Sequence, residues 1–241
     1  MTTNIRPRIA EQIAIASRML VAEGILCYSG HVSSRIPGTD HFMIQSASDS
    51  RADLDPSRIL TVDKNGKVID GDLRPPLELA LHVEMLKARP DVGAVLHCHM
   101  EEAIAFTMMK GVKLLPMRVY AKRWGDDIPV HHNPGHIATA EQGQALAATL
   151  GDRNAALIRA HGIVMTAESV PALFVDAVHF AETAKMQLMV MQAGQEPLPL
   201  NDEEMEMISS PREFHVAKLW NYYVRQGQAT GRIPEDWHGD L

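Results

Sequence analysis

Hydrophobic positions along this chain recur with two periods, one typical of helices and one typical of strands. Apolar residues at helical spacing up to Leu20, followed by Gly24, predict an amphipathic helix over about residues 8–23. The segment 30–38 begins with turn chemistry and is expected to form a loop. The same reasoning predicts further helices over 77–88, 101–109, 139–150, 170–192 and 212–226, and strands over 42–45, 58–62, 91–99 and 155–158.

Local turn and capping signals define the ends of some of these elements. Asn65-Gly66 is the strongest hairpin signal and is expected to pair residues 60–62 with 67–69. The stretch from Thr139 to Gln142 has the spacing of a helix capping box. Helices and strands alternate without an internal repeat, and the first third of the chain favours antiparallel sheet. The pattern therefore predicts an α/β fold.

Composition indicates one globular domain over residues 1–241, because 46% of the positions are hydrophobic and can bury a large core. The C-terminal tail over about 195–241 is expected to be irregular outside its helix and to cover a pocket or a subunit interface. The formal charge is −7, with 23 Lys and Arg against 30 Asp and Glu and no basic run, so we expect no nucleic-acid partner and no membrane binding. Small molecules are the expected partners.

Cysteine usage and the N-terminus favour a cytoplasmic protein. Cys27 and Cys98 are the two cysteines of the chain, which makes a disulfide framework unlikely to form and favours a reducing compartment. The segment 1–8 carries charge but lacks the apolar region of a secretory signal, and no stretch approaches the length of a membrane span.

Three histidines provide the candidate chemistry. His97 and His99 lie two residues apart on a predicted strand, so their side chains point to the same face, and His161 ends a second apolar run. Three imidazoles with an open position are typical of a catalytic zinc site. From spacing alone, two histidines on one strand face are equally consistent with core or surface residues.

An ordered series of motifs resembles the class II aldolase/adducin family from about residue 8 to 195. The motifs are Gly30-His31-Val32-Ser33, Glu78-x-x-x-His82, Pro90-x-Val92-x-Ala94-Val95-x-His97-x-His99 and His161-Gly162. The resemblance implies a three-layer α/β/α domain with a mostly antiparallel central sheet. It also implies a homo-oligomer, usually a tetramer, with the active site at a subunit interface.

The resemblance assigns roles to five residues. It implies that His97, His99 and His161 hold one divalent metal ion per chain, with Zn²⁺ favoured and Mn²⁺ or Co²⁺ as alternatives. Glu78 matches the family's catalytic acid/base, and Tyr120 matches a tyrosine that donates a proton in a neighbouring subunit's site. Glu78 as a first-turn acid of its helix and Tyr120 as an interface aromatic remain alternatives.

The residues that bind phosphate in sugar-phosphate members of the family are replaced here. His31 stands in place of an Asn, Ala47-Ser48 in place of a Thr-Gly pair, and Pro76-Leu77 in place of two serines. Proline has no amide donor and leucine has no hydroxyl, so a sugar phosphate is disfavoured.

The polar groups that remain near these positions favour a carboxylate-bearing substrate. The candidate substrate-binding residues are His31, Ser46, Ser48 and Arg51. Arginine binds carboxylates through two parallel hydrogen bonds, and histidine adds a further donor. The alternative for Arg51 is a surface ion pair with Asp49 or Asp53.

Three functions fit the sequence. We favour a metal-dependent lyase that works through a metal-stabilised enolate and decarboxylates a hydroxylated aromatic or related hydroxy or keto carboxylate. The alternatives are an aldolase of an unphosphorylated hydroxy-keto compound and, more distantly, a non-catalytic adducin-like interaction module. His82 is expected to lie in the core or behind the ligands. The histidines at 131, 132 and 136 favour a solvated loop over a second metal site.

Overall fold

The computed structural model describes residues 5–125, 127–207 and 211–241. Its described residues form an eight-stranded sheet in the order β4-β3-β2-β1-β5-β8-β7-β6. The parallel pair β6–β7 lies at one edge, and the other neighbouring strands pair antiparallel. The strands are β1 (His31–Arg35), β2 (Phe42–Gln45), β3 (Ile59–Val62), β4 (Val68–Asp70), β5 (Ala94–Cys98), β6 (Val130–His131), β7 (Ala155–Ile158) and β8 (Gly162–Ala167).

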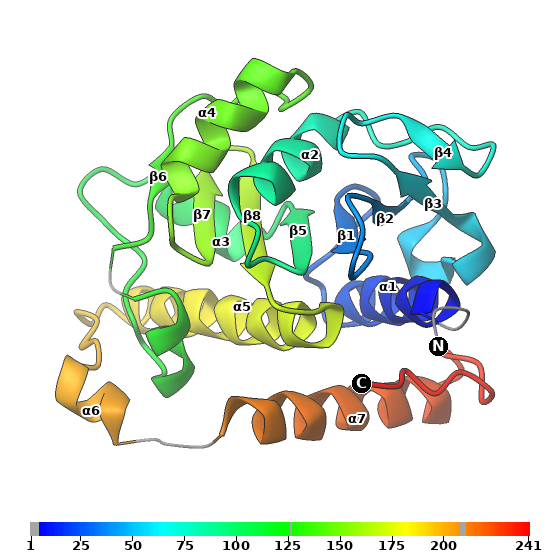
Figure 1. Cartoon of the computed structure of the whole chain (residues 1–241). Helices are drawn as coiled ribbons and strands as arrows, with labels where there is room; N and C mark the ends of the chain where they lie inside the picture. The colour runs from blue at the N-terminus through cyan, green and yellow to red at the C-terminus, as the bar shows by residue number, and fades with distance from the viewer. Residues whose placement is uncertain (1–4, 126, 208–210) are drawn as a thin grey trace.

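Helices lie on both faces of this sheet, as Figure 1 shows. α2 and α4 cover one face, α1 and α5 cover the other, and α7 packs outside α1 and α5. The helices are α1 (Ile5–Ala22), α2 (Leu79–Ala88), α3 (Glu101–Phe106), α4 (Ala140–Leu150), α5 (Val170–Gln192), α6 (Asp202–Glu206) and α7 (Arg212–Ala229), with short 3-10 turns η1 (Arg51–Asp53), η2 (Pro56–Arg58) and η3 (Val119–Arg123). Two apolar cores fill the spaces between the sheet and these two helix layers.

Most of the predicted elements are confirmed. The hairpin at Asn65-Gly66 joins β3 and β4, and α5 has the predicted bounds. Thr139 accepts a hydrogen bond from the backbone of Gln142, whose side chain bonds back to the cap, so the capping box begins α4 as predicted. The predicted helix over 77–88 begins two residues later, at Leu79.

The predicted loop over 30–38 is wrong, because residues 31–35 form β1, a central strand between β2 and β5. Its sequence, His-Val-Ser-Ser-Arg, has too few apolar residues for a buried strand. Its polar side chains are nevertheless buried, with His31 5% exposed and Ser33 fully covered. Buried polar residues in a central strand are typical of a functional site, and they obscure the strand's periodicity.

Other elements were missed, including the two-residue strand β6 in the segment that was expected to be a loop. β8 is fully buried and directly follows a turn after β7, so its apolar run merges with those around it. The short α6 lies in the tail that was expected to be irregular, and Asn201 caps its first turn.

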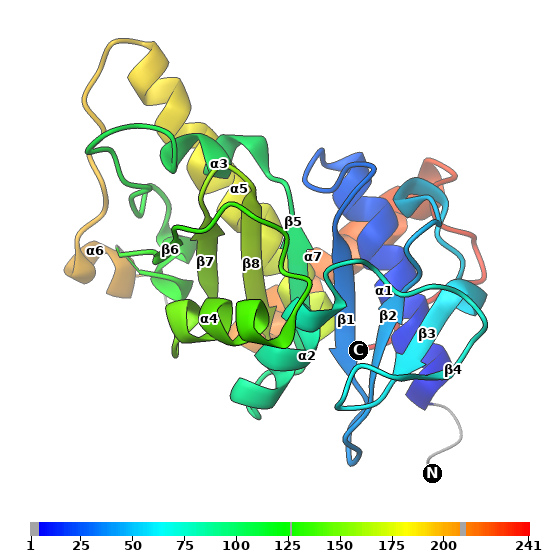
Figure 2. The ribbon, with the colours of Figure 1, turned by 90° about the horizontal axis from the view of Figure 1, so that it is seen from above.

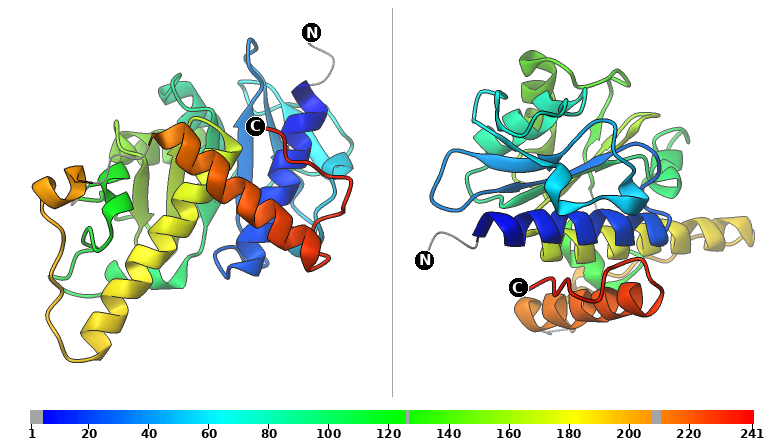
Figure 3. Two further views of the ribbon diagram at one scale, coloured as in Figure 1. Left: turned by 90° about the horizontal axis from the view of Figure 1, so that it is seen from below. Right: turned by 90° about the vertical axis from the view of Figure 1, so that its right-hand side faces the viewer.

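The C-terminal tail packs on the helix layer formed by α1 and α5. The indole N–H of Trp220 on α7 donates to the carbonyl of Gly239, and the carboxylate of Glu11 on α1 accepts from the backbone of Gly239. Figure 3 shows α7 and the chain end beside α1 from two directions. Within the described residues, no helix is long and apolar enough to cross a membrane.

Candidate metal centre

Four side chains converge where β5 ends and β8 begins. His97 is on β5, His99 follows it directly, His161 precedes β8, and Glu78 lies immediately before α2. One ligand atom from each lies within 4.8 Å of the others. Figure 2 shows α2 beside the central strands that carry these residues. Cys98 points into the opposite core, where burial raises the pKa of its thiol to about 12.

The hydrogen bond of His97 leaves a lone pair directed at Glu78. Its Nδ1 lies 2.9 Å from the carbonyl oxygen of Ile163, which can only accept, so Nδ1 carries the proton. Nε2 is then unprotonated in the neutral ring, yet it lies 3.1 Å from Oε2 of Glu78. Two acceptors at this distance repel each other unless a cation lies between them.

The other two histidines also have unpaired nitrogens in the interior. Nε2 of His99 and both ring nitrogens of His161 are buried and have no hydrogen-bond partner among the described residues. Buried polar atoms without partners are rare and require an explanation. A divalent cation bound by three imidazoles and a carboxylate would satisfy one nitrogen of each ring, so the residues fit the metal that the family implies.

The ionisation states suit ligation. Burial is the main cause that lowers the pKa of His99 to about 4, and it is also the main cause that lowers the pKa of His161. Burial raises the pKa of Glu78, but its contacts with His97, the backbone of Ile137 and His161 outweigh this and hold it well below its ordinary value. At neutral pH His99 and His161 therefore offer neutral imidazoles, and Glu78 offers an ionised carboxylate.

Comparison with known proteins identifies the family. Residues 11–188 match the model of the class II aldolase and adducin N-terminal domain. The chain belongs to this family. It is 29% identical to the 3,4-dihydroxyphthalate decarboxylase of Rhodococcus jostii (strain RHA1) over 231 residues, covering 90% of this chain and 93% of that protein.

Two further similar proteins are an aldolase, which resembles this chain in sequence, and a solved structure, which resembles it in fold. A 5-methylthioribulose-1-phosphate/5-deoxyribulose-1-phosphate aldolase of Rhodospirillum rubrum is 30% identical, covering 75% of this chain and 79% of that protein. A solved aldolase II superfamily protein from Pseudomonas syringae superposes with a TM-score of 0.82 at 24% identity, covering 99% of this chain and 97% of that one. The decarboxylase and the aldolase show that the family supports lyase chemistry of more than one kind.

The side chain of Glu78 is directed into the centre and does not cap its helix. Glu78 occupies the N-cap position of α2 without a side-chain cap hydrogen bond. Instead its Oε1 accepts a hydrogen bond of 3.0 Å from the backbone N–H of Ile137. This bond holds the carboxylate toward the histidines, so the helix-dipole alternative does not account for its orientation.

Close backbone contacts around the histidines require glycine at two positions. A Cβ on Gly162 would lie 2.9 Å from Cε1 of His97 and 3.1 Å from Cδ2 of His99. A Cβ on Gly30 would lie 2.8 Å from the carbonyl oxygen of His97. Ala160 has a φ of 53°, which is strained for a residue with a side chain and shapes the turn that carries His161.

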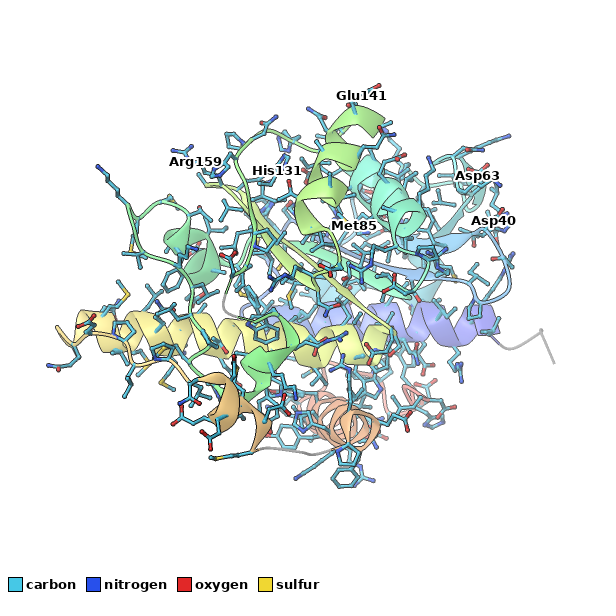
Figure 4. All side chains as sticks on the ribbon, turned by 60° about the vertical axis from the view of Figure 1, so that its left-hand side comes forward. Asp40, Asp63, Met85, His131, Glu141 and Arg159 are labelled. Carbon is cyan, nitrogen blue, oxygen red and sulfur yellow. The ribbon has the colours of Figure 1, made fainter. Side chains whose placement is uncertain are left out.

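His136 lies at the rim of the centre, which the sequence reasoning did not anticipate. Its Nδ1 is 3.7 Å from Oε1 of Glu78, and its exposed ring contacts that of His161. By contrast, the expected solvated loop is wrong for His131, which is buried in β6 and bonds to Thr149. The backbone of Arg159 donates to the carbonyl of His131, and Figure 4 shows the two side by side. In the sequence, His136 could be noticed only because it lies shortly before the capped start of α4.

His31 lies beside the metal residues because β1 pairs with β5. His31 and His97 are register partners, and their ring centroids are 5.4 Å apart. Nδ1 of His31 contacts Nε2 of His82 at 3.0 Å, and Nδ1 of His82 contacts Oγ of Ser33 at 2.7 Å. Burial is the main cause that lowers the pKa of His31 well below its ordinary value and that of His82 to about 3. His82 therefore lies behind the centre, as expected.

The other predicted substrate residues occupy the loop after β2. Arg51 is 6% exposed, and its guanidinium donates to the carbonyl oxygens of Gly30 and Ala47 at 3.1 Å each. The alternative for Arg51, a surface ion pair with Asp49 or Asp53, is absent from the described contacts: the carboxylate of Asp49 pairs with Arg58, and that of Asp53 pairs with Arg18. Ser46 is buried and donates to Asp49, whereas Ser48 is exposed.

Tyr120 lies in a different cluster of its own chain. Its ring stacks on His179 of α5 and His215 of α7, with centroids 3.9 and 4.5 Å apart. Within the described residues, its ring contacts are confined to these two histidines. The structure of one chain therefore does not bring Tyr120 to the metal centre.

Proposed function

We propose that this chain is a metal-dependent decarboxylase of a hydroxylated aromatic carboxylate. The observation that carries the proposal is the convergence of three imidazoles with unpaired nitrogens and the ionised Glu78 beside His31. Similarity to a 3,4-dihydroxyphthalate decarboxylase over nine-tenths of the chain supports the reaction type. A related hydroxy or keto carboxylate is the broader substrate class.

In this proposal His97, His99 and His161 hold the ion, with Glu78 as a further ligand that substrate displaces. Three imidazoles favour Zn²⁺, and Mn²⁺ or Co²⁺ are the alternatives. A bound divalent ion supplies positive charge that stabilises the substrate oxygens as the carbon–carbon bond breaks. The Nδ1–H bond from His97 to the carbonyl of Ile163 orients the imidazole for this role.

Glu78 is the proton carrier of the proposed reaction. As a carboxylate it accepts the proton of a ring hydroxyl next to the substrate carboxylate. It then gives this proton to the ring carbon that bears the carboxylate, which makes the ring a ketone. The bond to the carboxylate breaks, its electron pair restores the aromatic ring as a phenolate, CO₂ leaves, and the phenolate takes a proton from water.

The substrate-facing residues suit a carboxylate better than a phosphate. Pro76 and the exposed Leu77 offer no side-chain donor beside Glu78. His31 faces the centre and Ser48 is exposed on the neighbouring loop. Arg51 and Ser46 remain proposed substrate-binding residues, and their hydrogen bonds to backbone carbonyls and to Asp49 hold this loop in place.

We further propose that the protein is a homotetramer in which Tyr120 of one chain reaches a neighbouring centre. Tyr120→Phe preserves the ring stack but removes the hydroxyl. If Tyr120 donates a proton, this variant will lose turnover while keeping its metal and its oligomeric state by light scattering. Unchanged turnover would leave Tyr120 as a packing residue.

The test is CO₂ release from a panel of ortho-hydroxy aromatic acids, including 3,4-dihydroxyphthalate, with Zn²⁺, Mn²⁺ or Co²⁺ restored. We expect CO₂ with one of these acids and none with the Glu78→Gln variant. The second candidate is an aldolase, which the similarity to the aldolase of Rhodospirillum rubrum favours. Release of an aldehyde or ketone from hydroxy-keto compounds, without CO₂, would replace the decarboxylase proposal.

A further inference from the structure

Three buried side chains, Ser33 and His31 on β1 and His82 on α2, form a hydrogen-bonded series that ends beside the metal centre. Oγ of Ser33 lies 2.7 Å from Nδ1 of His82, and Nε2 of His82 lies 3.0 Å from Nδ1 of His31. Ser33 and His82 are fully covered, and His31 is 5% exposed. Buried imidazoles without a carboxylate partner are neutral, so each ring carries one proton whose position the neighbours decide.

The hydroxyl of Ser33 decides which atom donates in each hydrogen bond of this series. Among the described residues, its hydrogen-bond partner is Nδ1 of His82 alone. If the hydroxyl accepted from Nδ1–H, its own proton would have no acceptor in the interior, which is costly. The hydroxyl therefore donates, and the proton of His82 is on Nε2.

The position of the proton on His82 in turn decides the position of the proton on His31. Because Nε2–H of His82 donates, Nδ1 of His31 must accept, and the single proton of His31 is on Nε2. This Nε2 has no protein partner among the described residues, and the ring lies 5.4 Å from that of His97. A protonated nitrogen cannot bind a metal ion, although it can donate to an anionic oxygen.

We propose that Ser33 and His82 fix the tautomer of His31, so that its Nε2–H donates to an anionic substrate oxygen and cannot ligate the metal. In this hydrogen-bonded series Ser33 and His82 are positioning residues, and His31 is a substrate-binding residue. It explains why a fourth histidine lies beside the three ligands without joining them. The identity of the oxygen, a carboxylate or phenolate, rests on the proposed function.

The tautomer is measured directly by solid-state ¹⁵N NMR of the full-length, metal-free protein labelled in its histidines. Spectra of His31→Gln and His82→Gln assign the signals. We expect protonated Nε2 and unprotonated Nδ1 in both rings of the wild type. A protonated Nδ1 on His31 overturns the proposal.

Variants at neighbouring positions of β1 separate the effect of the hydrogen-bonded series from that of packing. Ser33→Ala should give mixed tautomers of His31 and lower kcat/KM by about 10- to 100-fold, while the metal is retained. Ser33→Thr keeps the hydroxyl and should restore both. Ser34→Ala is the matched control, since Ser34 points to the other face and makes only a 3.4 Å contact with its neighbour's carbonyl.

Two further results complete the test. His31→Gln should keep the wild-type metal content, and its loss would make His31 a ligand and overturn the proposal. An unchanged ¹⁵N spectrum in Ser33→Ala would also overturn it. If no acid of the panel releases CO₂, the proposed function fails, while the NMR spectra still decide the tautomer.

Discussion

The molecule holds two histidine clusters that differ in chemistry. In the metal centre, formed by Glu78, His97, His99 and His161, buried nitrogens are left without partners. In the α5–α7 cluster, formed by Tyr120, His179 and His215, Nδ1 of His179 contacts Glu182 and its Nε2 contacts Nε2 of His215 at 2.9 Å. Unpaired, convergent lone pairs therefore distinguish the proposed metal site from the other cluster, and the number of histidines alone does not.

The second cluster is also stabilised by stacking and charge. Tyr120 stacks on both histidines, and Arg118 pairs with Glu182 at 2.7 Å. These contacts join α7 to α5 and η3. We therefore expect changes in this cluster to alter stability, and changes in the metal centre to alter chemistry.

The largest expected effect is on turnover in Glu78→Gln. The amide cannot carry a proton, so kcat should fall by about 10²- to 10⁴-fold while the fold and far-UV circular dichroism stay unchanged. Glu141→Gln, on the exposed surface of α4, is the control and should keep full turnover. Equal turnover in Glu78→Gln and the wild type would remove Glu78 from the reaction.

The next effect is on metal affinity in Gly162→Ala. The added Cβ would press on the rings of His97 and His99, so affinity should fall by about 10- to 100-fold in isothermal titration. Gly227→Ala on α7 is the control, because its Cβ meets the side chains of Ile233 and Met19 and none of the four residues of the centre. It should lower the free energy of unfolding but not metal affinity. If Gly162→Ala lowered the free energy of unfolding but left metal affinity unchanged, Gly162 would have only a packing role.

The free energy of unfolding should depend on pH because buried imidazoles such as that of His82 stay neutral in the folded state. His82 has a pKa of about 3 when folded and an ordinary value when unfolded, so the unfolded state binds more protons between these values. The free energy of unfolding of the metal-free protein should therefore fall as pH drops below about 6.5, by about 1.4 kcal/mol per unit for this residue. Urea titrations of the wild type and His82→Gln would measure it. A wild-type slope no steeper than that of the variant contradicts it.

The smallest effect is expected in the α5–α7 cluster. His215→Ala removes a stacked ring and should lower the free energy of unfolding by about 1 kcal/mol without changing metal content. Thermal unfolding and elemental analysis of one preparation would measure both. Loss of metal in this variant would erase the distinction between the clusters.

The helices and the histidine strand were predictable because their signals are local. Alternation placed His97 and His99 on one face, and the family motifs linked them to His161 and Glu78. β1 was missed because its buried serines and His31 break the apolar pattern. The hydrogen bond from Arg51 to the carbonyl of Gly30 could not be predicted, because it joins residues far apart in the sequence. Pairings such as Ser33 with His82 depend on tertiary contacts and leave no mark in the sequence.

Metal content of the purified protein tests the central claim most directly. We predict about one divalent ion per chain in the wild type and in His179→Ala, and almost none in His97→Ala. Full metal content in His97→Ala, or loss of the ion in His179→Ala, would contradict the assignment of Glu78, His97, His99 and His161 as the metal centre.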